Sequence, residues 1–272
     1  MQSEQELRRL YLDLIKRSLM NAIYQDAQYQ SISMKHGMRP LLAWAARRLR
    51  LELVRKSDPT MTSEGRIWPQ SAHTMIGERR LDNLQHCVEE VLRDQVPGNL
   101  IETGVWRGGA CILMRAVLKA YGSTDRTVFV ADSFAGIPKP TNAIDESDPA
   151  GTLHRDHQLA VSLEQVKANF KAYDLLDDQV TFVKGWFCDT LPTLATGPLA
   201  VVRLDGDLYQ STMDGLSNLY PRLSAGGFLI VDDYEIQACR QAVDEYRSRN
   251  RIEEPIQSID WTGIYWRKAR HA

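Results

Sequence analysis

The sequence predicts an α/β fold built on a mostly parallel β-sheet with helices on both faces, and three observations predict it. From residue 99 onward, short apolar segments alternate with segments whose apolar residues recur at helical spacing. The apolar segments are nearly continuous, as is typical of strands buried on both faces of a parallel sheet. The chain then finishes with two strand-like segments joined by a tight connection, which predicts an antiparallel last strand.

Residues 1–65 are expected to form an N-terminal helical extension, and residues 66–272 the domain that contains the sheet. Apolar residues at helical spacing predict a helix over residues 7–24. A second, arginine-rich helix is expected within residues 40–56. We interpret it as a docking helix with solvated arginines; contact with anionic lipid or with a substrate is the alternative.

The larger domain is expected to open with a helix over residues 74–94, which Pro97 and Gly98 bring to an end. Strands are then predicted at residues 99–104, 127–134, 180–185, 199–205 and 226–233, and the closing hairpin at residues 255–268. The intervening helices are predicted at residues 109–122, 162–176, 211–223 and 237–249. The second of these begins with a capping box formed by Ser162 and Gln165.

Composition narrows the class of protein. The formal net charge is −2, so the chain has no general electrostatic attraction to nucleic acid, and no nucleic-acid partner is expected. The four cysteines are scattered without a CxxC pair, which disfavours a structural zinc site and fits a reducing cytoplasm. There is no secretory signal and no apolar run long enough to span a membrane. We therefore expect a cytoplasmic protein.

Most of the predicted strands end in polar or acidic residues. Glu102 lies near the end of the first strand and Asp132 near the end of the second. The run "RLDGDLYQST" carries Asp205 and Asp207 after the fourth strand, and "GGFLIVDDYE" carries Asp232 and Asp233 after the fifth. In open parallel sheets, ligands bind outside the carboxyl ends of the strands, so these acids mark the expected site.

The first strand is followed by a glycine-rich turn, "TGVWRGGA", which allows a backbone to approach a ligand just before a helix begins. This is neither the GxGxxG pattern of dinucleotide-binding folds nor a phosphate-binding loop. Asp132 occupies the place where an acid commonly binds ribose hydroxyls, although a helix or turn cap is the alternative for this residue taken alone.

The acids after the fourth and fifth strands predict a cation. Asp205, Asp232 and Asp233 would bring like charges together, which raises carboxyl pKa values unless a cation lies among them. Oxygen-only ligands favour a hard divalent ion such as Mg²⁺, Ca²⁺ or Mn²⁺. The alternative is that these acids only cap the helices that follow.

Several motifs in the same order resemble those of the macrocin O-methyltransferase family, which methylates sugar hydroxyls of macrolide and aminocoumarin antibiotics. The motifs are "LIETGVWRGGA", "VADSFAGIP", "GWFCDTLP", "RLDGDLYQST", "GGFLIVDDY" and the upstream "WPQSAHTMIGERRLDNLQHCVE". The resemblance covers about residues 66–267 and is much weaker over the first 60 residues. It implies a Rossmann-like class I methyltransferase fold with a seven-stranded sheet, S-adenosylmethionine as cofactor and a bound Mg²⁺.

The resemblance also assigns roles to residues. It implies a cofactor site formed by Thr74, Met75, Ile76, Glu102, Thr103, Gly104, Trp106, Gly109, Asp132, Ser133, Gly185, Trp186 and Phe187. Asp205, Asp232 and Asp233 match the metal ligands of the family, and Asp205 also matches the general base. The segment from about Ile137 to Ala160 is expected to be a lid, and a homodimer or higher oligomer is expected.

The expected reaction is therefore metal-assisted methylation of a sugar hydroxyl on a glycosylated small molecule or glycolipid. Three alternatives remain from the sequence: a catechol-type O-methyltransferase acting on aromatic diols, a nucleotide-binding or NAD-linked α/β module without methyl transfer, and a non-catalytic protein on the same scaffold. The missing GxGxxG pattern disfavours the second, and the clustered carboxylates disfavour the third.

Overall fold

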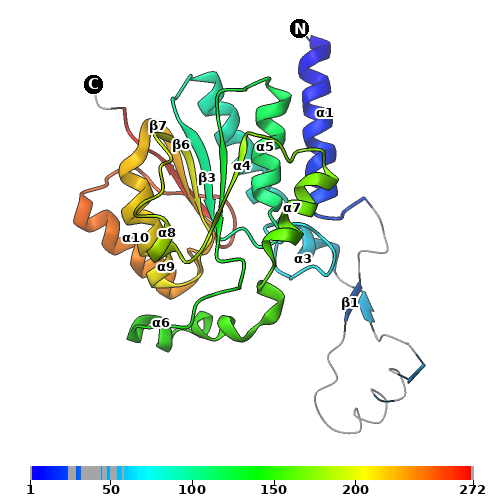
Figure 1. Cartoon of the computed structure of the whole chain (residues 1–272), viewed down its shortest axis with the longest axis vertical. Helices are drawn as coiled ribbons and strands as arrows, with labels where there is room; N and C mark the ends of the chain where they lie inside the picture. The colour runs from blue at the N-terminus through cyan, green and yellow to red at the C-terminus, as the bar shows by residue number, and fades with distance from the viewer. Residues whose placement is uncertain are drawn as a thin grey trace.

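The computed structural model describes residues 2–23, 29–31, 44, 48–49, 54–56 and 58–270. A seven-stranded sheet lies at its centre, with helices packed on both faces (Figure 1). The strand order is β5-β4-β3-β6-β7-β9-β8. The strands are β3 (Asn99–Thr103), β4 (Val128–Asp132), β5 (Val180–Lys184), β6 (Leu199–Leu204), β7 (Leu223–Val231), β8 (Gln257–Ser258) and β9 (Ile264–Arg267).

The predicted α/β fold with an antiparallel finish is confirmed. The first five strands of this order, β5-β4-β3-β6-β7, pair in parallel with their neighbours. Strand β9 pairs antiparallel with β7, and β8 pairs antiparallel with β9. The helices are α1 (Gln2–Leu19), α3 (Pro59–Ser63), α4 (Gly77–Arg93), α5 (Gly109–Ala120), α6 (Ala143–Ser147), α7 (Leu163–Ala172), α8 (Phe187–Thr190), α9 (Tyr209–Leu219) and α10 (Gln237–Asn250). Short 3₁₀ turns span Pro149–Arg155 (η2), His157–Leu159 (η3) and Tyr220–Arg222 (η4).

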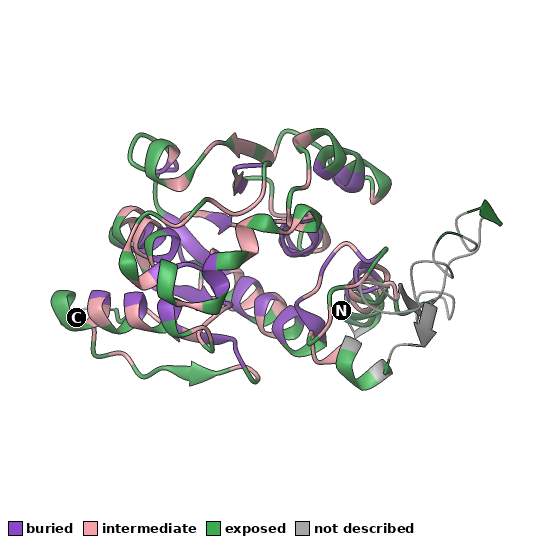
Figure 2. Cartoon of the chain, turned by 90° about the horizontal axis from the view of Figure 1, so that it is seen from below, coloured by how far each residue is buried: buried purple, intermediate pink, exposed green. Residues whose placement is uncertain are grey.

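The sheet buries apolar side chains on both faces, which explains why its strands are almost wholly apolar. Alternate residues of each strand point to opposite faces. Leu100, Val128 and Ile230 join a core shared with α1, α4, α5 and α7. Ile101 and Leu229 join a second core shared with α9 and α10. The purple buried segments in Figure 2 follow these strands and the inner faces of the helices.

Helix α1 extends the layer of helices on one face of the sheet and packs against α5 (Figure 1). Leu12 and Leu19 on its inner side are fully buried in the first core. The helix begins and ends about five residues earlier than the apolar spacing predicts. A domain boundary at residue 65 stays a prediction.

The basic helix expected within residues 40–56 lies almost entirely outside the described residues. Among its described residues, Trp44 and Arg48 are helical, whereas Val54–Lys56 form strand β2, which pairs antiparallel with β1 (Tyr29–Ser31). This pairing supplies the backbone hydrogen bonds that a helix would otherwise supply. Among the described residues, no helix combines the length and apolar character that crossing a membrane requires.

The carboxyl ends of β3 and β6 lie so close together that the turn after β3 depends on a glycine. Gly104 has a φ of +83°, a conformation that disfavours residues with a Cβ atom. A Cβ atom added there would lie 1.6 Å from the backbone oxygen of Asp205, the first residue after β6. The glycine turn and the first acid loop are therefore in direct backbone contact.

Substitution of this glycine should destabilise the protein by more than the backbone conformation alone explains. Gly197 makes the matched control, because it also has a positive φ, +63°, but a Cβ atom there would contact nothing within 4 Å. We expect Gly197→Ala to lower the free energy of unfolding by about 1 kcal/mol and Gly104→Ala to lower it by at least about 2 kcal/mol more. Urea denaturation measures both. Equal losses would show that the two strand ends can separate without cost.

Candidate active site

A cavity of about 1010 Å³ opens at the carboxyl ends of the parallel strands. All but two of the predicted cofactor residues line this cavity. The exceptions are Thr103 and Gly185, whose backbone groups form hydrogen bonds with residues that do line it. Thr103 accepts a hydrogen bond from the backbone N–H of Asp205 (2.9 Å), and Gly185 donates one to the carbonyl of Asp132 (3.0 Å). The predicted metal ligands line the same cavity, so the two groups of residues share one space.

Asp132 holds the glycine turn in place from the end of β4. Its carboxylate accepts hydrogen bonds from the backbone N–H groups of Val105 and Phe134, both at 2.7 Å. Burial raises the pKa of Asp132, while these hydrogen bonds oppose the rise. Each carboxylate oxygen can accept more than one hydrogen bond, so Asp132 retains acceptor capacity toward the cavity.

The segment just before α4 forms a wall of the cavity beside α5. Thr74, Met75 and Ile76 line the cavity, and Thr74 and Ile76 are almost fully buried. A Cβ atom on Gly109, the first residue of α5, would lie 2.4 Å from the carbonyl oxygen of His73. The segment therefore packs directly on the beginning of α5; its role in the cofactor site, which the family resemblance implies, stays a prediction.

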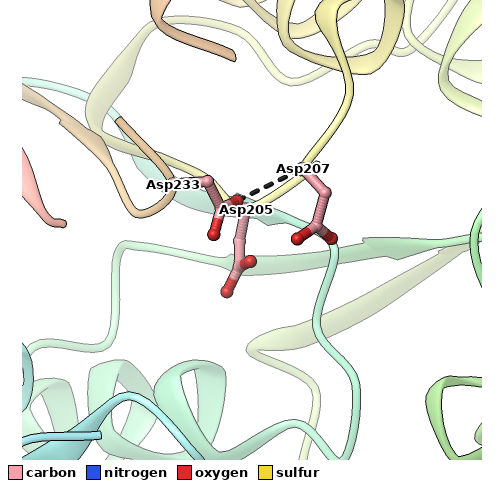
Figure 3. Close-up of side chains that lie close together, drawn as sticks. All are labelled: Asp205, Asp207 and Asp233. Atoms are coloured by element: carbon pink, nitrogen blue, oxygen red, sulfur yellow. Dashed lines mark hydrogen bonds between the residues drawn. The ribbon is translucent and has the colours of Figure 1, made fainter. Parts of the chain in front are cut away.

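Three carboxylates gather where β6 and β7 end. Single oxygen atoms of Asp205, Asp207 and Asp233 all lie within 4.8 Å of one another (Figure 3). Asp205 and Asp207 come from the loop after β6 and Asp233 from the loop after β7. The backbone N–H of Asp207 donates to Asp233 (3.1 Å), which joins the two loops (dashed in Figure 3).

The pKa values of these acids reflect their crowding. Burial, reinforced by the neighbouring carboxylates, raises the pKa of Asp205 to about 6 and that of Asp207 to about 8. The same causes raise the pKa of Asp233 well above its ordinary value. The donor set consists of oxygen atoms alone, which suits Mg²⁺, and a cation among them would relieve the repulsion.

The third predicted ligand, Asp232, lies beside this cluster in a network of ion pairs. Arg203 of β6, whose side chain is only 1% exposed, pairs with Glu102, Asp205 and Asp232. The Arg203–Asp205 distance is 2.8 Å. Arg80 of α4 pairs with the other oxygen of Asp232 and, at 3.0 Å, with Asp260. Both oxygens of Asp232 are thus held by arginines, although each keeps a lone pair for a further partner.

The network leaves the site short of positive charge. The guanidinium groups of Arg80 and Arg203 are the two cationic groups of the network. They lie among six carboxyl groups, those of Glu102, Asp205, Asp207, Asp232, Asp233 and Asp260. Burial raises the pKa of Glu102 to about 7, partly offset by Arg203. A cationic cofactor and a divalent ion are the kinds of ligand that would balance such a site.

Sequence reasoning missed Arg80, Arg203 and the position of Asp207. Arg203 did carry a signal, since it is the one charged residue inside the apolar run Leu199–Leu204, and a buried strand tolerates a charge only when it is paired. Arg80 carried none, because it lies on a helix rich in charged residues. Asp207 was recognised as a strand-end acid, but spacing alone does not show which of four neighbouring acids point together.

Comparison with known proteins identifies the family of the chain. The model of the macrocin O-methyltransferase (TylF) family matches residues 8–268. A Streptomyces olivaceus enzyme described as a rhamnosyl-tetracenomycin-C 4'-O-methyltransferase is 54% identical over 97% of this chain and 94% of its own length. The mycinamicin III 3''-O-methyltransferase of Micromonospora griseorubida is 52% identical over 96% of each chain.

Solved structures give the same result. The O-methyltransferase NovP superposes with a TM-score of 0.84 at 46% identity, covering 97% of this chain and 100% of its own. A calicheamicin methyltransferase shares the fold, with a TM-score of 0.57 at 21% identity over 69% of this chain and 78% of its own. The methyltransferase fold implies S-adenosylmethionine as the cofactor. The chain therefore belongs to the macrocin O-methyltransferase family and is an O-methyltransferase.

Proposed function

We propose that this protein methylates a sugar hydroxyl of a glycosylated small molecule, with help from a divalent cation. One observation carries the proposal: all but two of the residues expected to bind the cofactor line the same cavity as the cluster of strand-end acids. The relatives support the acceptor class, since their names specify a rhamnosyl-tetracenomycin, mycinamicin III and demethyldecarbamoylnovobiocin. A catechol-type acceptor, which the same metal chemistry would serve, is the alternative that the experiment must test.

When bound, S-adenosylmethionine supplies the methyl group, and a divalent ion lowers the pKa of the acceptor hydroxyl and fixes its direction. The residues of the chain position these partners, and positioning alone accounts for much of the acceleration in a displacement of this kind. The glycine turn and the 74–76 wall would hold the amino-acid end of the cofactor, Asp132 with Ser133 its ribose, and Trp186 with Phe187 its adenine.

We propose Asp205, Asp232 and Asp233 as the ligands of the ion, with Mg²⁺ as the ion. Asp205 and Asp233 belong to the cluster in Figure 3, and Asp232 keeps a lone pair on each oxygen despite its two arginine partners. Asp207 is a fourth carboxylate within reach of the same position. Arg203 holds one oxygen of Asp205 at 2.8 Å, which leaves the other oxygen to accept the proton of the acceptor hydroxyl.

The function is tested by offering the purified protein S-adenosylmethionine and Mg²⁺ with acceptors of two classes. One class comprises the glycosides named for the relatives, namely the rhamnosyl-tetracenomycin, mycinamicin III and demethyldecarbamoylnovobiocin. The other is catechol. Mass spectrometry should detect methylation of at least one glycoside on its sugar and none of catechol. Methylation of catechol alone would refute the proposal.

Loss of the Asp132 carboxylate should weaken cofactor binding. Asp132→Ala removes both the ribose acceptor and the hydrogen bonds that hold Val105 and Phe134. Loss of hydrogen bonds to a charged group corresponds to an increase of at least about tenfold in the Kd of S-adenosylhomocysteine, measured by calorimetry. Asp125→Ala, an exposed change in the loop before β4, is the control and should leave the Kd unchanged. An unaltered Kd for Asp132→Ala would contradict the ribose assignment.

Asp205→Asn should abolish turnover while leaving cofactor affinity nearly intact. The amide cannot accept the proton, and loss of a general base costs at least about 100-fold in kcat. Calorimetry with S-adenosylhomocysteine and initial rates on the best glycoside separate the two effects. Chelation of divalent ions should stop wild-type turnover, and added Mg²⁺ should restore it. A variant with most of its activity would remove Asp205 from the role of base.

We also propose a homo-oligomer in the cytoplasm. The outer face of α1 exposes Leu7, Leu10 and Leu14, each more than half exposed and spaced at three and four residues. A second copy of the same helix would cover such a stripe, as in a two-fold dimer. Light scattering of the wild type should give at least a dimer mass, and Leu10→Glu with Leu14→Glu should lower it. A monomeric wild type would contradict the oligomer.

A further inference from the structure

Residues 137–160, which we call the strap, form the roof of the cavity. They contain α6, η2 and η3 and extend below the main body of the protein in Figure 1. Pro138, Pro140, Asp145, Asp148, Leu153 and Leu159 line the cavity from the strap. Most of these side chains are apolar, so the strap presents an apolar surface to a ligand in the cavity, while the acids at the strand ends present a polar one. Two carboxylates of the strap form hydrogen bonds with α9 and α10. The proposed reaction assigns no role to these hydrogen bonds.

The first is Asp145, whose side chain is fully buried. One of its oxygens accepts the backbone N–H of Tyr209 at 2.6 Å, and the other accepts that of Gln210 at 3.2 Å. These are the first two residues of α9. The N–H groups at the beginning of a helix have no partner within the helix, and they attract negative charge. Asp145 therefore attaches the strap to the beginning of α9.

The second is Asp148, which attaches the strap to α10. One oxygen accepts the backbone N–H of Ala238, the second residue of α10, at 3.0 Å. The other oxygen accepts the backbone N–H of Ala150 within the strap at 2.8 Å. A single carboxylate thus joins a turn of the strap to a helix that lies 90 residues further along the chain.

The two helices that receive these carboxylates are the ones that follow the acid loops. Helix α9 begins two residues after Asp207, and α10 begins four residues after Asp233. The strap is also attached at its far end, where the indole N–H of Trp106 donates to the carbonyl of Gln158 at 2.9 Å. The roof is therefore fixed to the two helices that follow the acid loops and to the glycine turn.

We infer that Asp145 and Asp148 are positioning residues. Their hydrogen bonds to α9 and α10, which we call the latch, hold the strap over the part of the cavity where the acids of Figure 3 lie and where the acceptor would bind. The latch keeps the apolar roof at a fixed height above the acids, so that an acceptor is held with its hydroxyl toward Asp205. This inference rests on the proposed function for the identity of the acceptor. The latch itself is a property of the apo protein and its cofactor complex, and it can be tested without turnover.

Hydrogen–deuterium exchange of the S-adenosylhomocysteine complex tests the latch. Asp148→Ala and Asp145→Ala should each accelerate exchange over residues 137–160 by about fivefold to tenfold, the effect of losing a helix cap. Exchange at the beginning of α10 should rise in the first variant and that at the beginning of α9 in the second. Glu146→Ala is the matched control, because this exposed acid of α6 lies between the two and should leave exchange unchanged.

Asp148→Asn provides a second test should the alanine variants fold poorly. Asparagine has one acceptor oxygen, so it can keep one of the two hydrogen bonds of Asp148, and exchange should fall between that of wild type and that of Asp148→Ala. Exchange over 137–160 that is unchanged in folded Asp148→Ala and Asp148→Asn would overturn the latch.

Kinetics test the role of the latch in the reaction, with the rhamnosyl-tetracenomycin, mycinamicin III and demethyldecarbamoylnovobiocin as probes. For a probe that is turned over, the KM of the acceptor should rise about tenfold in Asp148→Ala, and the Kd of S-adenosylhomocysteine should change less than about twofold. A faster-exchanging strap with an unchanged acceptor KM would overturn the positioning role. Failure of the wild type on every glycoside would contradict the proposed function, while exchange would still decide the latch.

Discussion

The buried guanidinium of Arg203 is the constraint on which the rest of the site depends. It lies in the central strand β6 and pairs with Glu102 on β3, with Asp205 in its own following loop and with Asp232 after β7. A buried charge is tolerated only when its partners are held in place, and removing one partner of a buried ion pair typically costs about 3–5 kcal/mol. Three neighbouring strand ends are therefore tied to one residue, which fixes the positions of Glu102, Asp205 and Asp232.

The same network explains why the cavity suits a cation. Arg203 and Arg80 satisfy Glu102, Asp232 and Asp260, but Asp207 and Asp233 have no arginine partner within the described part of the chain. Their carboxyl groups meet each other and Asp205 instead. The arginines fix the geometry and leave these crowded carboxyl groups facing the cavity, where a bound cation would favour their ionised form. The proposed divalent ion and a sulfonium cofactor are both cations, so both would be favoured in this one cavity.

Much of this could be predicted from sequence, because the information is local. Apolar runs marked the strands of the sheet. The acids predicted for the site lie in the last two residues of a strand or in the first two residues after it, so strand ends and candidate ligands were found together. The contacts that arrange these acids are not local. Arg203 lies 101 residues from Glu102, Arg80 lies 152 residues from Asp232, and Asp145 lies 64 residues from Tyr209. Such pairings depend on how the layers pack, and the residue types alone do not indicate them. The helix prediction was wrong at Val54–Lys56 for a related reason, since the pairing of these residues with β1 is not visible from their own sequence.

A thermal-shift titration tests the central claim most directly, with S-adenosylhomocysteine and NADH as ligands, each with Mg²⁺ and with a chelator at matched ionic strength. A ligand that binds only the native state raises the apparent Tm. We expect a saturable rise in Tm with S-adenosylhomocysteine, a separate saturable rise with Mg²⁺ that the chelator reverses, and none with NADH. Stabilisation by NADH alone, or a Mg²⁺ effect that other salts reproduce at equal ionic strength, would contradict the central claim.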